Sequence, residues 1–161
     1  MTQTYQVRDG ARIMAFDGVC IAKVSSRRPS SPRWTELELY RTDTGKYVLA
    51  KIGRSVVVHV PGCPRLFGHL PKFVEEHPDQ VPENGFEYDE CVPEEYDFNT
   101  LLVEQTRFWA LVADAASAIV NELHTVKGGV RVLPRMAVNL LEAAALIDGQ
   151  IADAFYIEHV V

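Results

Sequence analysis

Hydrophobic and polar residues partly alternate along the first 60 residues, and turn-forming residues interrupt the apolar runs. In the stretch WTELELYRT, Leu37 and Leu39 fall on one side of an extended chain, whereas Glu36, Glu38 and Tyr40 fall on the other. This alternation is typical of a strand with one buried face and one face in solvent. We therefore predict an N-terminal antiparallel sheet of roughly three to five short strands.

Turn-forming residues set the expected boundaries of these strands. Asp17-Gly18 lies between two apolar runs and has the chemistry of a two-residue hairpin turn. We expect either a hairpin there or one long strand with a bulge at Gly18. The DTGK stretch at 43–46 is expected to turn the chain back, and Gly53 to mark a bulge or bend in the next strand.

Residues 61–98 hold six of the nine prolines of the chain. Each proline removes a backbone donor and restricts the residue before it, so we expect no long regular element here, only one short helix around 72–77. Acidic residues alternate with the aromatic side chains of Phe86, Tyr88, Tyr96 and Phe98. This composition predicts an extended, proline-rich acidic strap that its aromatic residues hold in place.

The period of the apolar residues becomes helical after residue 98. Apolar positions recur at steps of three and four from Leu101 to Leu123, which predicts a helix that ends at Lys127-Gly128-Gly129. A second helix is predicted to begin with Pro134 in its first turn and to end near Asp148-Gly149. Alanines in both segments leave little side chain between the helix axes, so we expect a helical hairpin packed on the sheet.

The last residues, 150–161, fit two structures. Their first half is able to extend a helix, whereas FYIEHVV alternates and favours an edge strand of this sheet or of a partner's sheet. The whole chain predicts an α+β fold in a single domain over 1–161. Its parts are a β-sheet lobe over 1–60, the acidic strap over 61–98 and a helical part over 99–161.

Composition adds an expectation about the compartment. The N-terminal stretch MTQTYQVRDG lacks the apolar core of a secretory signal, and no apolar run approaches the roughly 20 residues of a membrane-spanning helix. The sequence therefore predicts a soluble cytoplasmic protein that does not bind membranes. Cys20, Cys63 and Cys91 are widely spaced, so we expect free thiols rather than a disulfide framework.

The net charge of −6 is unevenly distributed along the chain. Residues 1–56 carry ten basic and five acidic side chains, residues 57–98 carry two and ten, and residues 99–161 carry four and seven. A mildly basic segment therefore precedes a strongly acidic one. Adjacent segments of opposite charge usually lie near each other or face solvent separately. Only sometimes is one of the two segments a binding surface.

Motifs for catalysis or metal binding are weak. The sequence contains no phosphate-binding glycine loop, no zinc-protease helix motif and no nucleophile elbow. His59, Cys63 and His69 offer ligands that Zn²⁺ prefers, but their spacing matches no closed zinc finger. Cys63 with His59 also has the composition of a nucleophile pair, for which only Arg65 lies nearby as an activating cation. We predict no cofactor.

The pair Glu36 and Glu38 has an alternative interpretation as a catalytic site. Two carboxylates at i and i+2 of one strand are able to hold Mg²⁺ or to divide the roles of acid and base. A magnesium nuclease would add an aspartate and a lysine, and the sequence shows no such arrangement. The solvent face of a strand explains the pair better, so the sequence favours a protein that is not an enzyme.

The stretch KVSSRRPSSPRW, residues 23–34, is the most distinctive basic feature. Arginine offers a planar fork for phosphate, and Trp34 and Tyr40 offer rings on which bases stack. The residues predicted to contact nucleic acid are Arg27, Arg28, Arg33, Trp34, Arg41, Lys46 and Lys51. Against this hypothesis stands a pI near 5.3, whereas a dedicated nucleic-acid binder usually exceeds about 9.

Three functional hypotheses follow. The first is a non-catalytic interaction or regulatory protein that recognises a macromolecular partner, most readily another protein, through its acidic strap and its arginine-rich loop. In the strap the residues predicted to bind the partner are Glu83, Glu87, Tyr88, Asp89, Glu94, Glu95 and Tyr96. The second is a nucleic-acid-binding protein, and the third is a small enzyme that uses a metal or Cys63. Self-association through the helices or the tail is a further expectation.

Overall fold

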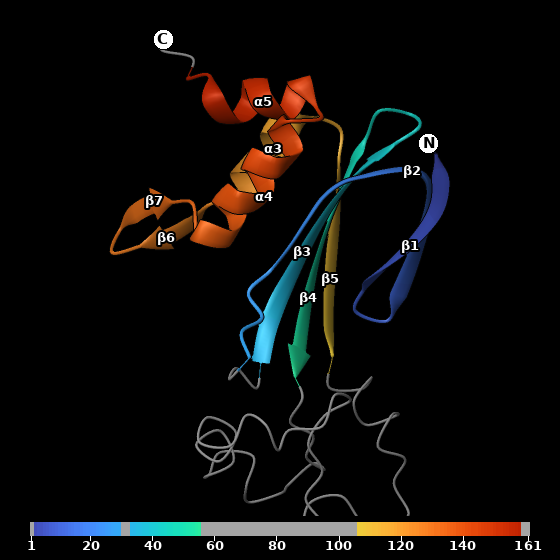
Figure 1. Cartoon of the computed structure of the whole chain (residues 1–161), viewed down its shortest axis with the longest axis horizontal. Coiled ribbons are helices and arrows are strands. Elements are labelled where there is room, and N and C mark those ends of the chain that lie inside the picture. Colours follow the sequence, from blue (N-terminus) through green and yellow to red (C-terminus); the bar gives the residue numbers. More distant parts are fainter. Residues whose placement is uncertain (1, 30–32, 56–105, 159–161) are drawn as a thin grey trace, which may run out of the picture. The chain divides into compact units, whose positions relative to one another are not determined.

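The computed structural model describes residues 2–29, 33–55 and 106–158 (Figure 1). The strands and helices, in chain order, are β1 (Gln3–Asp9), β2 (Arg12–Ser25), β3 (Arg33–Thr42), β4 (Tyr47–Ser55), β5 (Arg107–Ala113), α3 (Ala116–Leu123), β6 (Thr125–Lys127), β7 (Val130–Val132), α4 (Arg135–Ala145) and α5 (Gly149–Tyr156). The fold is α+β, as predicted: an N-terminal antiparallel sheet with C-terminal helices packed on it.

The chain divides into two compact units. The first consists of Met1–Ser25, Glu36–Lys51 and Phe108–Val161, and the second of Ser26–Thr35 and Ile52–Arg107. The helices and most of the described sheet belong to the first unit. Of the second unit the structure describes residues 26–29, 33–35, 52–55 and 106–107. The predicted strap over 61–98 and the short helix around 72–77 lie outside the described residues.

The five long strands form one sheet in the order β1-β2-β3-β4-β5. Strand β2 is shared by two ladders, because its first half pairs with β1 from Gln3↔Gly18 to Asp9↔Arg12 and its second half pairs with β3 from Gly18↔Thr42 to Ser25↔Glu36. Gly18 is therefore the residue at which the pairing of β2 changes from β1 to β3. A Cβ atom at this position would overlap the backbone carbonyl oxygen of Arg41.

The predicted hairpin turn at Asp17-Gly18 is wrong, since β2 runs straight through it. The chain turns instead at Gly10, whose φ of 60° belongs to the left-handed region that glycine tolerates best. The alternative of one long strand is confirmed, but the irregularity lies between Cys20 and Ala22 rather than at Gly18. The predicted turn at 43–46 is confirmed, with Gly45 at a φ of 86°.

The sheet curls until its two edge strands meet. The backbone N–H of Gly10, at the end of β1, donates to the Phe108 carbonyl of β5 at 2.9 Å. The Ala110 N–H donates to the Asp9 carboxylate at 3.3 Å. The Arg8 guanidinium lies 4.2 Å from the centroid of the Phe108 ring. These contacts hold the first and last strands of the sheet together at one end.

Both faces of the sheet are buried, each in its own core. Strand β4 shows this most clearly, because Tyr47 and Leu49 belong to the core under the helices while Val48 and Ala50 belong to the core on the other face. The second core also contains Val7, Tyr40 and Ala110, with Tyr5, Met14, Phe16 and Cys20 packed against it. Strand β1 and the first half of β2 therefore cover the face that faces away from the helices.

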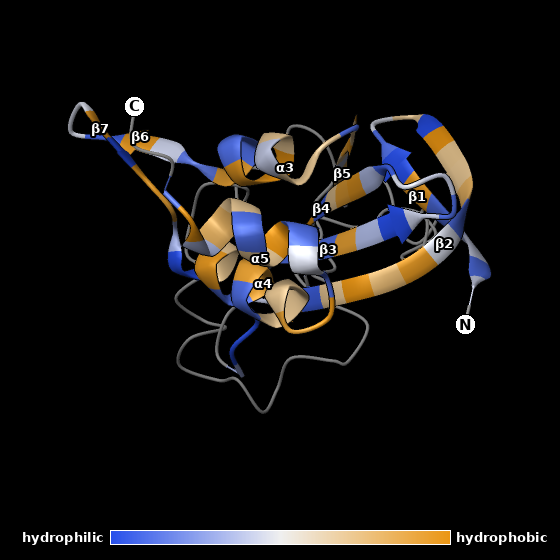
Figure 2. Ribbon diagram, turned by 90° about the horizontal axis from the view of Figure 1, so that it is seen from above, coloured by the Kyte–Doolittle hydropathy of each residue, from blue (hydrophilic) through white to orange (hydrophobic). Residues whose placement is uncertain are grey.

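Three short helices cover the first face of the sheet (Figures 1 and 2). Helix α4 buries Ala137, Leu140, Leu141 and Ala144, whose spacing of three and four places them on one side of the helix. Helix α4 packs on β2, and α5 packs on both α3 and α4. The predicted beginning of the second helix at Pro134 is confirmed, since Pro134 is the N-cap of α4.

The predicted helix from Leu101 to Leu123 is wrong over Arg107–Ala113, which form strand β5. Apolar residues at steps of three and four were compatible with a helix, but this segment alternates as well. Ala110 is buried in one core and Ala113 in the other. A strand between two cores places successive residues on opposite faces, which the single apolar stripe of a surface helix cannot do.

The stretch Lys127-Gly128-Gly129 does not end a helix as predicted. Helix α3 ends at Leu123, and the two glycines, with φ values of 59° and 76°, form the turn of a separate β6–β7 hairpin. The tail takes the helical alternative: α5 extends through Tyr156, which leaves no strand over 155–158. No helix in the described ranges is long and apolar enough to span a membrane.

Candidate functional site

The arginine loop, which we define as residues 26–29 and 33–35, consists of the residues that follow β2 and the first three residues of β3, and it belongs to the second unit. A pair of hydrogen bonds closes its base. The Ser26 N–H donates to the Thr35 carbonyl at 2.9 Å, and the Thr35 N–H donates to the Ser26 hydroxyl at 2.9 Å. Serine suits this place because its short side chain bonds readily to nearby backbone. The base of the loop is therefore a defined structure.

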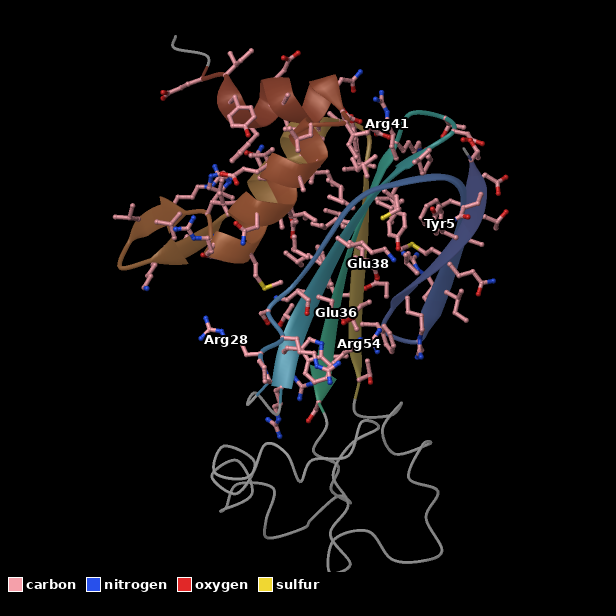
Figure 3. All side chains as sticks on the ribbon, in the orientation of Figure 1. Tyr5, Arg28, Glu36, Glu38, Arg41 and Arg54 are labelled. Carbon is pink, nitrogen blue, oxygen red and sulfur yellow. The ribbon has the colours of Figure 1, made fainter. Side chains whose placement is uncertain are left out.

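Arg27 and Trp34 face each other across this base. The central carbon of the Arg27 guanidinium lies 4.5 Å from the centroid of the Trp34 ring, within the range of a cation–π contact. Arg27, Arg28 and Arg33 are exposed, while Trp34 is half-buried. Figure 3 shows Arg28 extending outward from the loop. The structure thus brings one predicted arginine onto the predicted tryptophan and leaves the other two at the surface.

The other predicted basic residues, Arg41, Lys46 and Lys51, belong to the first unit. Arg41 Nη1 lies 3.0 Å from Asp148 Oδ2, and the Lys46 ammonium lies 3.6 Å from Asp114 Oδ1. Lys51 is exposed on β4. Two of these three cations therefore have a carboxylate partner within the same unit. Their predicted contact with nucleic acid stays a prediction.

A second candidate site is the polar cluster, which we define as Tyr5, Cys20, Lys23, Glu38 and Tyr40. It lies on the sheet face that β1 covers, where the register places Cys20 opposite Tyr40 and Lys23 opposite Glu38. The Tyr40 hydroxyl donates to Glu38 Oε2 at 2.6 Å, and the Lys23 ammonium lies 2.9 Å from the same oxygen. Figure 3 labels Tyr5 on β1 and Glu38 on β3, the strands on either side of β2.

Burial and charge fix the protonation of this cluster. Burial, and then the hydrogen bond to Glu38, raise the pKa of Tyr40 far above its usual value. The hydrogen bond to Glu38 raises the pKa of Lys23, and burial raises the pKa of the Cys20 thiol. At neutral pH, Tyr40 is therefore a donor, Lys23 is charged and Cys20 is a thiol. A protonated thiol is a poor nucleophile, so this arrangement favours structure over catalysis.

These contacts correct the prediction that Glu36, Glu38 and Tyr40 form a solvent face. Tyr40 is only 4% exposed and packs against Tyr5 and Phe16, with ring centroids 4.8 and 5.3 Å away. Its ring is therefore not available for stacking on a base. The alternation predicted for β3 is present, but β1 covers this face. Residues 2–9 are mostly polar, so the sequence did not predict β1 as a strand.

Sequence reasoning missed Asp148, the buried carboxylate that joins the helices to the sheet. It is 4% exposed and accepts hydrogen bonds from the backbone N–H groups of Gln150 and Ile151 at the start of α5. It also accepts from the Tyr47 hydroxyl at 3.0 Å and pairs with Arg41. An aspartate before a helix is a recognisable N-cap. Its bonds to the sheet have no local signal.

The remaining predicted site residues lie outside the described residues. These are the strap residues Glu83, Glu87, Tyr88, Asp89, Glu94, Glu95 and Tyr96 and the metal candidates His59, Cys63 and His69. Within the described ranges, no group of three His, Cys, Asp or Glu side chains is arranged to hold a metal ion. Comparison of the chain with protein-family models, curated proteins and solved structures gives no match.

Proposed function

We propose that this chain is a non-catalytic interaction protein whose arginine loop binds an acidic segment of a protein partner. The observation that carries the proposal is the contact between Arg27 and Trp34 at 4.5 Å. Stacking on an aromatic ring limits the orientations of a guanidinium before any partner arrives. Pre-organisation of this kind lowers the entropy lost on binding.

The chemistry of the loop indicates the kind of partner. Arg27, Arg28 and Arg33 present exposed cations, and a planar guanidinium pairs well with a carboxylate. Arginine and tryptophan are also the residue types that contribute most at protein interfaces. The acidic strap remains the second predicted contact surface, for basic residues of the same partner.

Binding of nucleic acid is less well supported than binding of an acidic protein segment. Tyr40 is buried, and Arg27 occupies one side of the Trp34 ring, so the two rings predicted to stack on bases are already engaged. Arg41 and Lys46 have carboxylate partners. Nucleic acid is therefore the alternative that the experiment must separate from the proposal.

The experiment uses Trp34 as its reporter. The chain has two tryptophans, so Trp109→Phe leaves Trp34 as the sole one. Titration with poly-L-glutamate should change its fluorescence, and replacing Arg27, Arg28 and Arg33 together by alanine should weaken binding by about tenfold or more. The matched control replaces by alanine Arg12, Lys51 and Arg135, which are exposed outside the arginine loop and give the same net charge.

Two outcomes would contradict the proposal. Equal loss of binding in the two triple variants would show that only net charge matters. Binding of single-stranded DNA in place of poly-L-glutamate, with an affinity that falls steeply with salt and depends on the loop arginines, would assign the loop to nucleic acid.

A further inference from the structure

The β6–β7 hairpin stands apart from the five-stranded sheet. It forms a two-stranded sheet of its own, and both views show it extending away from the helices (Figures 1 and 2). Val126 is 75% exposed and Val130 is 61% exposed. An isolated two-stranded hairpin is at best marginally stable in water, so its order requires an anchor. We call residues Thr125–Val132 the basic arm.

Arg131 is that anchor. Its Nη2 donates to the backbone carbonyl and to the side-chain oxygen of Asn121, both at 3.2 Å, which ties the arm to the end of α3. Gly128 and Gly129 supply the positive φ angles of the turn. The arm is therefore held in an extended position without any partner, which lowers the entropy lost when a partner binds.

The register shows what the arm presents. Val126 lies opposite Arg131, and Lys127 lies opposite Val130, so one face of the arm carries Val126 and Arg131 and the other carries Lys127, Val130 and Val132. No acidic residue occurs between Leu123 and Arg135. Strands of three residues offer little backbone for the addition of another strand. A partner surface must therefore combine exposed apolar side chains with carboxylates.

The α4–α5 surface of this same chain has that combination. Leu146, in the turn between the two helices, is 88% exposed, and the exposed Glu142 precedes it by one helical turn. Ile157, at the end of α5, is 52% exposed, and the exposed Asp153 precedes it by one turn. Of the ten exposed large hydrophobic residues in the described ranges, six lie between Val126 and Ile157, where arm and helices are found.

We propose that the chain forms a symmetric dimer in which the basic arm of each copy lies on the α4–α5 surface of the other. In a two-fold dimer each copy must carry both of the surfaces that meet. Here these are the basic arm and the α4–α5 surface, and one copy carries both. Valines of the arm cover Leu146 and Ile157, and Lys127 pairs with Glu142 or Asp153. The arginine loop takes no part, so this proposal is independent of the proposed function.

Charge exchange between the two halves tests the dimer. Sedimentation velocity of the full chain should show a dimer that dissociates on dilution. Lys127→Glu, or Glu142→Lys together with Asp153→Lys, should each raise the dimer Kd by about tenfold or more, because like charges then face each other. An equimolar mixture of the two variants should restore a dimer, since both arm–helix contacts are then complementary. Lys51→Glu, an exposed reversal on β4, should leave the Kd unchanged.

A monomer at all concentrations would overturn the proposal, and binding of that monomer to vesicles of phosphatidylcholine and phosphatidylserine would assign the arm to anionic lipid instead. A dimer that neither reversal weakens would also overturn it. So would two variants that keep the wild-type circular dichroism, lose the dimer and fail to restore it when mixed.

Discussion

Arg41 and Asp148 lie 107 positions apart in the chain, yet Arg41 Nη1 is 3.0 Å from Asp148 Oδ2. The same carboxylate caps α5 and accepts the hydroxyl proton of Tyr47. One buried side chain therefore joins two strands of the sheet to the last helix. Asp148 is buried, whereas the Arg41 side chain is 35% exposed, and the Tyr47 hydroxyl also reaches Gln150 Oε1 at 3.2 Å.

Asp148→Ala should destabilise the protein by about 1–3 kcal/mol, because it removes the N-cap of α5, the nearest acceptor of the Tyr47 hydroxyl and the ion pair with Arg41. The measurement is unfolding in guanidinium chloride, followed by circular dichroism. Asp114→Ala, at a carboxylate that is 88% exposed, is the control and should change stability by less than about 0.5 kcal/mol. Equal effects of the two variants would show that Asp148 is no special contact.

Alkaline pH should weaken the fold through Tyr47. Burial, and then the hydrogen bond to Asp148, raise the pKa of Tyr47 to about 12, above its value in the unfolded chain. A pKa raised by folding means that the stabilisation is complete below pH of about 10 and is lost as the pH rises toward 12. Tyr40 acts in the same direction.

Stability measured between pH 8 and 11 checks this prediction. The wild type should lose stability above pH of about 10, and Tyr47→Phe should lose less over the same interval because it has no phenol to ionise there. Tyr156→Phe, at an exposed tyrosine on α5, should follow the wild type. If the free energy of unfolding of Tyr47→Phe fell with pH as steeply as that of the wild type, a group other than Tyr47 would cause the alkaline sensitivity.

Gly18→Ala should destabilise the sheet by about 1–3 kcal/mol or more. The added Cβ would overlap the Arg41 carbonyl oxygen and would lie 2.9 Å from the Thr42 Cα, and both are backbone atoms that cannot move aside cheaply. Gly149→Ala is the matched control, since a Cβ there meets nothing within 4 Å and the residue begins a helix. It should leave stability unchanged or raise it slightly. Thermal unfolding of the two variants is the comparison.

Glu38→Ala should cost about 1–3 kcal/mol, because the buried Tyr40 hydroxyl then lacks its acceptor. Lys23→Ala should cost less than about 1 kcal/mol, since that ammonium is largely in solvent. A double-mutant cycle with Tyr40→Phe measures the coupling: Glu38→Ala should cost less in that background than in the wild type. Additive costs would show that the short Tyr40–Glu38 contact contributes nothing.

The sequence predicted those elements whose signals are local. Alternation in β3, the Gly45 turn and the spacing of Leu140, Leu141 and Ala144 each depend on residues within one element, and each is found in the structure. Strand β5 was mistaken for a helix because its place between two cores is set by β4 and β1, which are distant in sequence. Local propensity yields to such contacts.

The candidate sites show the same limit. The arginine loop was recognisable from composition, but the contact of Arg27 with Trp34 depends on how the base of the loop closes. The polar cluster requires β1 to cover β3, and a polar stretch such as residues 2–9 gives little indication of a strand in a core. The contacts within both sites depend on pairing across strands, which residue types alone do not show.

The ends of β4 and β5 have a consequence for how this architecture tolerates change. A Cβ at Gly53 would stand 3.5 Å from the Cβ of Arg107, so the chain leaves the sheet and returns to it at neighbouring points of adjacent strands. Topologically, residues 56–106 are an insertion between two partners of one ladder. A tight turn could replace them, and a roughly tenfold shorter connection would lower the loop-closure entropy by about 2 kcal/mol. The pairing of β4 with β5 therefore sets where residues 56–106 begin and end, and does not itself require a connection of that length.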